Sequence, residues 1–465
     1  MTLHKNGDIA AGCLPAEQLA ANFADVASPL SAHAAVVEAH RCCYCYDAPC
    51  VNACPTSIDI PGFIRKIGNG NLVGAARDIL SANPLGGMCA RACPTEILCE
   101  GACVLNHQDS MPVAIGALQR HATDHQMEHE VVSGKPLFAR AADTGRHVAV
   151  VGAGPAGLAC AHTLALSGHR VTIFDAHDKP GGLNEYGIAA YKTVDDFAQR
   201  EVQWLLSIGG IELHARRQLG RDFALTQLRE QFDAVFLGIG LGGINALHAD
   251  GETLAGVLNA VDFIAQLRQS DDLSTLPVGH QVVVIGGGNT AIDAAVQSVK
   301  LGARQVTMAY RRGAAQMSAT SAERDFARKQ GVVLLEWARP LRIVGMLQAG
   351  SSDAHASAVQ FETTRLDADG QLEGTGETFC IKADVVLKAI GQTLVSDGLD
   401  AQLLTLDGAR IAVDADGATS LPGVWAGGDC TNHPALDLTV QAVQDGKLAA
   451  HAIIRQFART VAKAG

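Results

Sequence analysis

Nine of the thirteen cysteines in this 465-residue chain fall between Cys42 and Cys103. They form two groups, Cys42-Cys43-x-Cys45-x4-Cys50-x3-Cys54-Pro55 and Cys89-x3-Cys93-Pro94-x4-Cys99-x3-Cys103. Iron–sulfur clusters need soft thiolate ligands, usually four for each cubane, and close-spaced runs that end in Cys-Pro are typical of paired clusters. The stretch therefore predicts two adjacent [4Fe–4S] clusters, and spacing alone would count Cys89 among the ligands.

Three other uses of cysteine compete with this interpretation. A zinc site takes two separated pairs of ligands, and Cys42 with Cys45 could supply one pair, but nine thiols exceed what one such site uses. A disulfide scaffold suits small secreted domains, whereas this chain is long and starts without a hydrophobic signal segment. Chance clustering of buried structural cysteines fits least well, because such residues scatter through a core, as Cys13, Cys160 and Cys380 do. Iron–sulfur ligation remains the prediction.

Composition bounds the class of protein. The chain is 48% hydrophobic and 18% charged, which allows several buried cores, and its length suggests about three domains. Its net charge of −12 and the absence of a basic block predict no nucleic-acid partner. Residues 148–168 carry no Asp, Glu, Lys or Arg, but their glycines and proline predict a strand, turn and helix rather than a membrane span. We expect a cytoplasmic protein without membrane attachment.

The first part of the chain is expected to be helical. Helices are predicted within residues 1–40, over 60–67 and 75–80, and from 115 to about 125, with a polar linker over 133–146.

A dinucleotide-binding pattern follows the linker. The strand 148–151 leads into Gly152-Ala153-Gly154-Pro155-Ala156-Gly157, and a second strand ends at Asp175. G-x-G-x-x-G between a strand and a helix, with an acid about twenty residues later, places a pyrophosphate at the helix start and a ribose near the acid. The strand 424–426, Gly427-Gly428-Asp429 and the predicted helix 438–454 return to the same unit near the end of the chain.

A second copy of the pattern lies inside the first. The strand 281–285 leads into Gly286-Gly287-Gly288-Asn289-Thr290-Ala291, and Arg311 with Arg312 follow the next strand, 305–310. Cations at this point can contact an adenosine phosphate, although a solvated pair of charges on a loop is the simpler alternative.

One nucleotide unit inside another is typical of two-dinucleotide flavoproteins. The predicted fold class is an α-helical Fe–S domain followed by two Rossmann-like domains, with the FAD domain interrupted by the NAD(P) domain. Predicted boundaries are 1–144 for the Fe–S domain, 145–278 and 390–465 for the FAD domain, and 279–389 for the NAD(P)H domain. The predicted FAD-binding residues are Gly152, Gly154, Pro155, Ala156, Gly157, Asp175, Gly182, Gly428 and Asp429. The predicted NAD(P)H-binding residues are Gly287, Gly288, Asn289, Thr290, Arg311, Arg312, Ala389, Ile390 and Gly391.

Over residues 40–455 the chain resembles the electron-entry half of dihydropyrimidine dehydrogenases in their bacterial two-subunit form, and more broadly the glutamate synthase small-subunit family. The resemblance rests on the two cysteine groups, the two glycine loops, Gly427-Gly428-Asp429, Asn83-Pro84-Leu85-Gly86 and residues 112–119. It implies a different ligand set from spacing alone. One cluster would be held by Cys42, Cys45, Cys50 and Cys103, and the other by Cys54, Cys93, Cys99 and Gln119. Cys43 and Cys89 would then be spare and pack near the clusters.

The resemblance also implies a function. NAD(P)H would reduce FAD, and two [4Fe–4S] clusters would pass the electrons to an FMN-containing partner subunit that reduces uracil and thymine to 5,6-dihydropyrimidines. The resemblance implies a hetero-oligomer such as a heterotetramer. No proton donor is predicted for the half reaction, so no catalytic residue is named.

Other assignments stay open. Glutamate synthase small subunits tend to carry glutamate where this chain has Gln119, so the glutamine favours the pyrimidine branch, unless it is simply a helix-surface residue. A disulfide reductase needs Cys-x-x-Cys beside the flavin, and Cys160 and Cys430 stand alone. NADPH-specific members have an arginine where this chain has Ser318, which favours NADH slightly.

Overall fold

The computed structural model describes residues 14–108, 111–276, 278–347, 354–396, 398–399, 404–434 and 436–464. The predicted helicity of residues 1–13 therefore lies outside the described residues. The chain forms two compact units. The larger unit contains residues 27–185, 195–243 and the chain from 393 onward, and the smaller unit contains the described residues up to Val26 together with 186–194 and 244–392.

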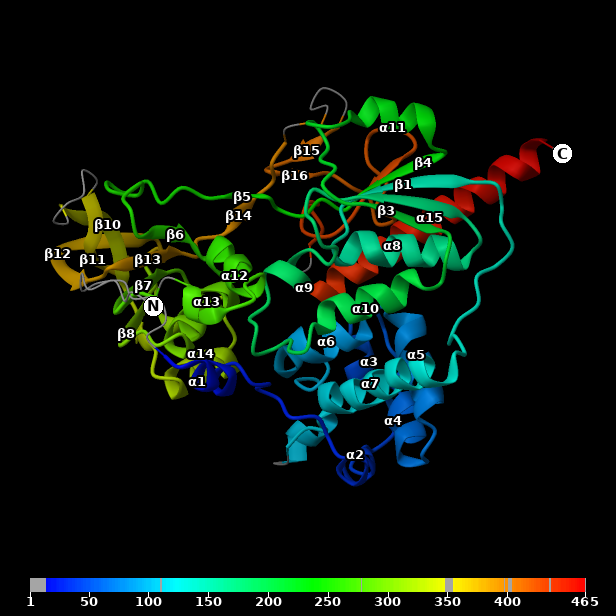
Figure 1. Ribbon diagram of the computed structural model, residues 1–465, viewed down its shortest axis with the longest axis horizontal. Helices are drawn as coiled ribbons and strands as arrows, with labels where there is room; N and C mark the ends of the chain where they lie inside the picture. The colour runs from blue at the N-terminus through cyan, green and yellow to red at the C-terminus, as the bar shows by residue number, and fades with distance from the viewer. Residues whose placement is uncertain are drawn as a thin grey trace. The chain divides into compact units, whose positions relative to one another are not determined.

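A five-stranded parallel sheet organises the larger unit, in the order β17-β4-β1-β2-β3. Its strands are β1 (His147–Val151), β2 (Arg170–Phe174), β3 (Ile211–His214), β4 (Ala234–Leu237) and β17 (Val424–Ala426). Successive side chains of a strand point to opposite faces. Val148 and Val150 accordingly pack with α8 (Pro155–Leu166) and α15 (Thr439–Ala464), while Ala149 and Val151 pack on the side of α11 (Leu225–Gln231). Figure 1 shows α8 and α15 on one face of this sheet and α11 on the other.

The cysteine-rich part of the larger unit is helical. It contains α2 (Ala32–Ala39), α3 (Pro49–Asn52), α4 (Ile60–Gly68), α5 (Leu72–Ala82), α6 (Gly86–Ala92), α7 (Ile115–Ser133) and the short 3₁₀ helices η1 (Thr95–Ile97) and η2 (Val104–Gln108). The helices predicted over 60–67 and 75–80 are confirmed, and Asp59 and Asn71 cap their first turns. α7 continues past residue 125 because nothing interrupts it before Gly134, whose φ of 64° ends the helix.

A second parallel sheet organises the smaller unit, in the order β6-β13-β7-β8-β9. Its strands are β6 (Val257–Asn259), β7 (Gln281–Ile285), β8 (Gln305–Ala309), β9 (Val333–Leu335) and β13 (Val385–Lys388). Val282 and Val284 pack in the core with α1 (Ala16–Asn22), α12 (Ala260–Arg268), α13 (Asn289–Lys300) and α14 (Ser321–Lys329). As in the larger unit, helices therefore cover one face of a five-stranded parallel sheet.

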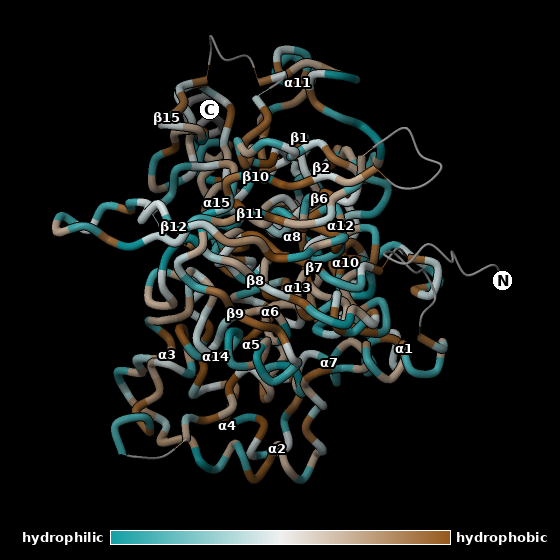
Figure 2. Tube along the Cα trace, turned by 90° about the vertical axis from the view of Figure 1, so that its left-hand side faces the viewer, coloured by the Kyte–Doolittle hydropathy of each residue, from teal (hydrophilic) through white to brown (hydrophobic). Residues whose placement is uncertain are grey.

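The opposite face differs from prediction. Val283 and Ile285 pack against an antiparallel sheet of β10 (Ala338–Leu347), β11 (Ala354–Leu366) and β12 (Leu372–Lys382), which the sequence analysis did not anticipate. In Figure 2 the turn that protrudes beside β12 is largely hydrophilic. The remaining elements are α9 (Leu183–Tyr186), α10 (Phe197–Leu206), η3 (Leu273–Thr275), η4 (Ala314–Gln316), β5 (Gly243–Ile244), β14 (Gln392–Thr393), β15 (Leu406–Asp407) and β16 (Arg410–Ile411).

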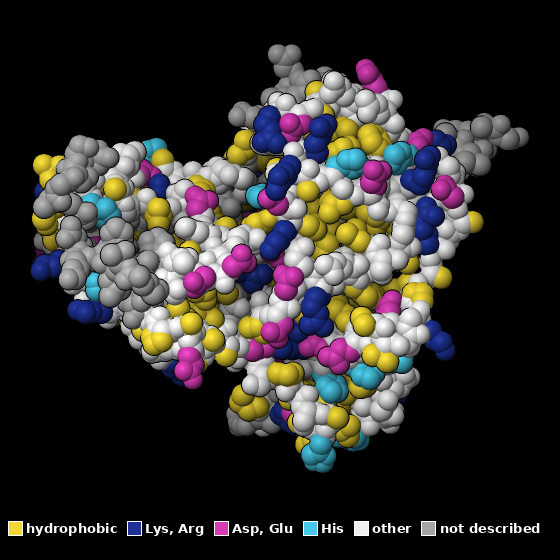
Figure 3. Space-filling view, in the orientation of Figure 1, with side chains coloured by type: hydrophobic (Ala, Val, Ile, Leu, Met, Phe, Trp, Pro, Cys, Tyr) yellow, Lys and Arg dark blue, Asp and Glu magenta, His cyan; other side chains and the backbone are white. Residues whose placement is uncertain are grey.

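The second nucleotide unit also begins earlier than the predicted boundary at residue 279. Residues 244–278 belong to the smaller unit because β6 pairs with β13 and α12 packs beside α13. Among the described residues, we find no helix whose length and apolar character would let it cross a bilayer. On the face shown in Figure 3, basic and acidic side chains are interspersed.

Candidate functional site

One pocket of the larger unit, the Cys42 pocket, is lined by five cysteines: Cys42, Cys43, Cys45, Cys50 and Cys103. Ile60, Ile64 and Ile115 are among the apolar residues that complete the wall. The four sulfurs proposed for one cluster thus share one pocket. Burial first, and then the neighbouring Cys42 thiol, raise the pKa of Cys50 to about 11. A bound metal would reverse this penalty by pairing with the thiolate form.

A second pocket, the Cys54 pocket, is lined by Cys54, Cys89, Cys93, Cys99 and Gln119, together with Asn83 and Val440. Gln119 is buried, with 7% of its surface exposed, so it is not a helix-surface residue. Its Nε2 donates to the carbonyl oxygen of Gly86 at 2.7 Å, which leaves Oε1 as the atom able to bind iron. The geometry suits the ligand role that the family resemblance implies for Gln119.

Cys89 competes with Gln119 for the fourth position of this pocket. It is buried, lies in the same lining and interacts with the Cys93 side chain, whose pKa is raised by that hydrogen bond and by burial. Asn83 contributes a further polar atom, because its Nδ2 is buried without a hydrogen-bond partner among the described residues. An unpaired amide donor in this wall suits a cluster sulfide, which accepts hydrogen bonds.

The number of cysteines in each pocket fits a cubane. Within the described ranges, no group of three or more His, Cys, Asp or Glu side chains is close enough to hold a single metal ion. A cubane takes one protein ligand at each iron, so its ligands surround a larger space. Two pockets ringed by cysteines fit that requirement.

The first glycine loop is closely packed. Gly152 has a φ of 100°, and a Cβ atom there would lie 2.2 Å from the carbonyl oxygen of Gly238. A Cβ atom at Gly157 would lie 1.9 Å from the oxygen of Gly152. These positions therefore need glycine, and they bring the start of α8 close to the strand, as a dinucleotide site requires. Gly182 lies beside Gly154 in the same loop region, where its own Cβ would approach the Gly154 Cα to 2.8 Å.

Asp175 follows β2 and faces this loop. Its Oδ2 accepts from the Ala153 backbone N–H at 2.6 Å, and its Oδ1 accepts from the His177 backbone N–H at 2.8 Å. The carboxylate therefore fixes the loop conformation in addition to the ribose contact proposed for it.

The start of α15 lies between two sites. A Cβ atom at Gly428 would lie 3.0 Å from the Ala156 Cβ and 3.5 Å from the Ala442 Cβ, so α15 packs directly on the first glycine loop and on the Gly428-Asp429 turn. Val440, two residues earlier in α15, lines the Cys54 pocket. The helix therefore touches both the predicted FAD-binding motifs and a predicted cluster site. Sequence reasoning missed Val440, because a single apolar helix residue carries no motif.

Glu201 of α10 was also missed. Its buried carboxylate accepts from the backbone N–H groups of Gly87 and Met88 at 2.7 and 3.1 Å. Burial raises the pKa of Glu201 to about 8, against the lowering effect of these hydrogen bonds. The residue holds the first turn of α6, which carries Cys89. The only signal in the sequence was an acid among the apolar positions of a helix.

In the smaller unit, the residues predicted to bind coenzyme gather at the carboxyl ends of β7, β8 and β13. Asn289 begins α13, and its Oδ1 is buried without a hydrogen-bond partner among the described residues. Ala389 donates its backbone N–H to Ile285 at 2.8 Å, which places residues 389–391 beside the glycine loop. Arg311 and Arg312 follow β8, and neither guanidinium group forms an ion pair within the described part of the chain. These features fit a phosphate-bearing coenzyme.

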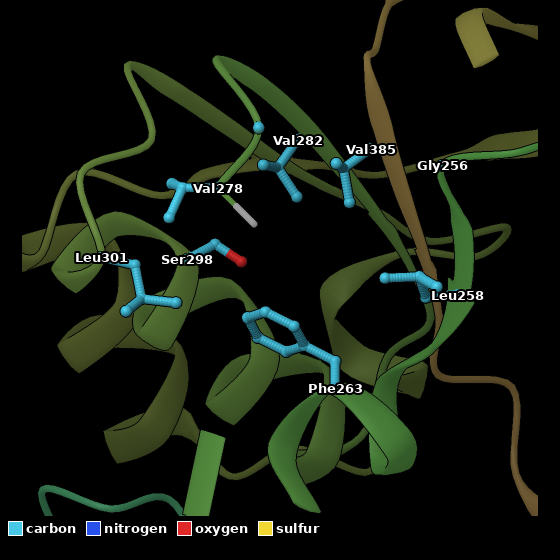
Figure 4. Close-up of a pocket in the computed structure, with 9 residues that line it drawn as sticks. Gly256, Leu258, Phe263, Val278, Val282, Ser298, Leu301 and Val385 are labelled. Carbon is cyan, nitrogen blue, oxygen red and sulfur yellow. The ribbon is translucent and has the colours of Figure 1, made fainter. Parts of the chain in front are cut away.

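An apolar cavity of about 170 Å³ lies at the opposite edge of this sheet (Figure 4). Val282 and Val385, at the starts of their strands, converge with the ring of Phe263, and Ser298 points its hydroxyl group inward. Because dinucleotides bind outside the carboxyl ends of parallel strands, this cavity is not the coenzyme site.

These sites define a class: a flavoprotein with two dinucleotide-binding units and a cysteine-rich iron–sulfur domain. Residues 146–446 match the pyridine nucleotide-disulphide oxidoreductase family, and residues 19–131 match the family described as dihydropyrimidine dehydrogenase domain II, 4Fe-4S cluster. The chain belongs to the pyridine nucleotide-disulphide oxidoreductases, in a branch that carries a 4Fe-4S domain. The chain uses FAD, iron–sulfur cluster chemistry and NAD(P)H.

Individual relatives cover nearly the whole chain. The glutamate synthase [NADPH] small chain of Escherichia coli is 32% identical over 449 residues, which are 93% of this chain and 93% of the relative. The corresponding small chain of Halomonas elongata is 32% identical, over 95% of this chain and 94% of the relative. The putative oxidoreductase UacF of E. coli is also 32% identical, over 96% of this chain and 71% of the relative.

Solved structures agree with the fold of the nucleotide units. FprA of Mycobacterium tuberculosis in complex with NADPH matches 69% of this chain and 86% of its own, with a TM-score of 0.57 and 19% identity. Thioredoxin reductase of T. acidophilum matches 67% of this chain and 99% of its own, with a TM-score of 0.53 and 22% identity.

Proposed function

We propose that this chain is an electron-entry subunit that oxidises NADPH and delivers electrons one at a time to a partner protein. The observation that carries the proposal is the position of α15. Its first turns pack on Ala156 and Gly428 of the predicted FAD site, and Val440 lines the Cys54 pocket. A flavin held by these motifs would lie close to the pocket, which is what electron transfer requires. Bound FAD accepts hydride from the coenzyme, and the clusters accept single electrons.

The pockets suggest an order for the clusters. Ile60 lines both the Cys54 pocket and the Cys42 pocket, so the two sites share one side chain as a wall. Cys43, in the Cys42 pocket, is exposed. We infer that electrons enter at the Cys54 pocket and leave from the Cys42 pocket toward the partner.

We favour NADPH as the donor. Ser318 points toward NADH, because it stands where related NADPH enzymes have an arginine. Against this, Arg311 and Arg312 present two guanidinium groups that form no ion pair within the described residues, beside the proposed coenzyme loop. Guanidinium groups bind phosphate in two-point contacts, and the small-chain relatives carry NADPH in their names.

Two partner classes remain, each favoured by a specific observation. The glutamate synthase small chains match this chain almost end to end and favour a glutamate-forming partner that takes glutamine as its nitrogen source. Buried Gln119 in the Cys54 pocket favours the FMN-containing pyrimidine-reducing partner. The comparisons support the first class more broadly, because they extend over the whole chain rather than over one residue.

Anaerobic stopped-flow mixing tests the donor and the partner together. The holoprotein should bleach its flavin faster with NADPH than with NADH, and the double variant Arg311→Gln/Arg312→Gln should lose that preference. Added to each candidate partner, the chain should support either glutamate formation or uracil reduction. Flavin reduction without electron delivery to any one-electron acceptor would contradict the electron-entry role.

A further inference from the structure

His433 lies between β17 and α15, in a stretch that neither glycine-loop motif includes. Only 10% of its side chain is exposed. Neither ring nitrogen has a hydrogen-bond partner among the described residues, although both are buried. An imidazole that gives up hydration without gaining a hydrogen bond is costly, so its position suggests a role toward a bound group or a proton.

The imidazole has two carboxylates near the same ring nitrogen. Its Nε2 lies 3.6 Å from Oδ2 of Asp445 and 3.9 Å from Oδ1 of Asp437. The Asp445 carboxylate accepts from the Gly428 backbone N–H at 3.0 Å, which ties it to the predicted flavin turn. Asp437 is 40% exposed and forms a two-point ion pair with Arg410, both contacts at 2.7 Å. The three side chains therefore lead from the flavin turn to solvent.

The charges around His433 are predominantly acidic. Burial first, and then Asp437, raise the pKa of Asp429 to about 6, while Arg410 and His433 oppose the shift. Burial also raises the pKa of Asp445. The charged groups that interact in this cluster are thus Asp429, Asp437, Asp445 and Arg410. Three carboxylates and one guanidinium group suit an imidazole that takes up a proton and releases it again.

The proposed function creates a need for such a residue. A hydride from NAD(P)H carries two electrons and one proton, whereas iron–sulfur clusters accept only electrons. One proton for each coenzyme oxidised must therefore leave the buried site: NAD(P)H gives NAD(P)⁺, two electrons to the clusters and one proton to water.

We propose that His433 receives this proton on the flavin side, next to Asp445, and passes it to solvent by way of Asp437. The inference rests on the proposed electron-entry function and adds a proton exit to it. Hydride transfer by itself needs no proton-carrying residue. The requirement arises only when the electrons leave singly.

The test separates the arrival of hydride from the departure of the proton. Holoprotein reduced with one equivalent of NADPH is mixed anaerobically with ferricyanide, and a pH-indicator dye follows proton release while absorbance follows the flavin. In His433→Gln, reduction by NADPH should keep its wild-type rate, whereas proton release and reoxidation should slow at least about tenfold. Imidazole added to His433→Ala should restore both rates. His451→Gln, on the later part of α15, is the matched control and should behave as wild type.

Asp437→Asn provides a second variant if the His433 variants lose FAD. It should slow proton release and flatten the pH dependence of reoxidation, because the outer carboxylate is gone. Wild-type proton release and an unchanged pH profile in either His433→Gln or Asp437→Asn would overturn the proposal. Failure of NADPH to reduce the wild-type flavin would overturn the proposed function itself, and the two failures are therefore distinguishable.

Discussion

The Cys54 pocket and the Cys42 pocket contain the same thiol chemistry in different surroundings. The Cys54 pocket adds a buried glutamine, the unpaired amide of Asn83 and a residue of α15. The Cys42 pocket has a mainly apolar wall and one exposed cysteine, Cys43. Hydrogen bonds, ligand charge and exposure set cluster potentials. The pocket beside the predicted flavin motifs is therefore distinguished by polar side chains, whereas the other pocket is distinguished by an exposed cysteine.

The largest effect should follow from removing one thiolate of each pocket. Cys54→Ser and Cys42→Ser should each cost about four irons, since one cubane holds four. Both variants should keep NADPH-dependent flavin bleaching, and both should lose reduction of a protein acceptor that can reach only the exit cluster. Iron analysis, electron paramagnetic resonance after dithionite reduction and acceptor assays measure this.

Cys380→Ser is the control for these variants, because Cys380 is an exposed residue of β12. It should retain all iron and full transfer. Electron delivery at the normal rate in Cys54→Ser would contradict the proposal that electrons enter at the Cys54 pocket and leave from the Cys42 pocket.

The next prediction concerns the fourth cluster ligand in the Cys54 pocket. Gln119→Leu should destabilise the cluster in that pocket and leave the other spectrum unchanged, because Oε1 is removed while the helix is kept. Gln119→Glu should retain iron and lower the cluster potential, because an anionic ligand favours the oxidised cluster. Cys89→Ser should change neither. Loss of the cluster in Cys89→Ser, with retention in Gln119→Leu, would transfer the ligand role to Cys89.

A smaller effect is expected from Asn83. Replacement by alanine should lower the potential of the cluster in the Cys54 pocket, because a hydrogen bond that stabilises the reduced cluster is lost. Redox titration followed by electron paramagnetic resonance measures the shift. Asn106→Ala is the matched control, since its Nδ2 already donates to the carbonyl oxygens of Glu100 and Gly101. Equal shifts in the two variants would show that Asn83 has no specific role.

The smallest expected effect is a pH dependence of stability that arises outside both pockets. It distinguishes unfolding of the protein at low pH from loss of the clusters at low pH. Burial lowers the pKa of His162, on α8, to about 4 from its ordinary 6.5. Below about pH 6.5 the unfolded chain therefore binds a proton at His162, whereas the folded chain leaves His162 unprotonated until the pH approaches 4. Stability is full above that pH and should fall by up to about 3 kcal/mol as the pH drops toward 4.

Urea unfolding between pH 4.5 and 7.5 measures this dependence. His162→Phe should flatten it, because an aromatic ring fills the space beside Phe138 and Trp204 without a titrating group. His33→Gln, at an exposed position of α2, should leave it unchanged. An unaltered slope in His162→Phe would assign the acid sensitivity to other groups.

Much of this architecture could be predicted because local patterns encode it. The glycine loops require the positive φ that the structure shows at Gly152 and the close approach of helix to strand at Gly157, and short runs of apolar residues mark β1 and β7. The same holds for the helices that bring the two cysteine groups together. The ligand sets, the coenzyme and the partner remain predictions or proposals.

What sequence reasoning missed depends on contacts between distant segments. The antiparallel strands β10 to β12 alternate weakly, and their place against Val283 and Ile285 comes from tertiary packing. Val440, Glu201 and His433 belong to no motif. Each becomes informative only when the fold sets it beside Cys54, Gly87 or Asp445, respectively.

Iron, acid-labile sulfide and flavin analysis of the anaerobically purified chain tests whether the chain holds two cubanes and one FAD. We expect about eight irons, about eight sulfides and one FAD for each chain, since each of the two cubanes holds four irons and four sulfides. Zinc in place of iron, or FAD with no iron under strictly anaerobic handling, would contradict it.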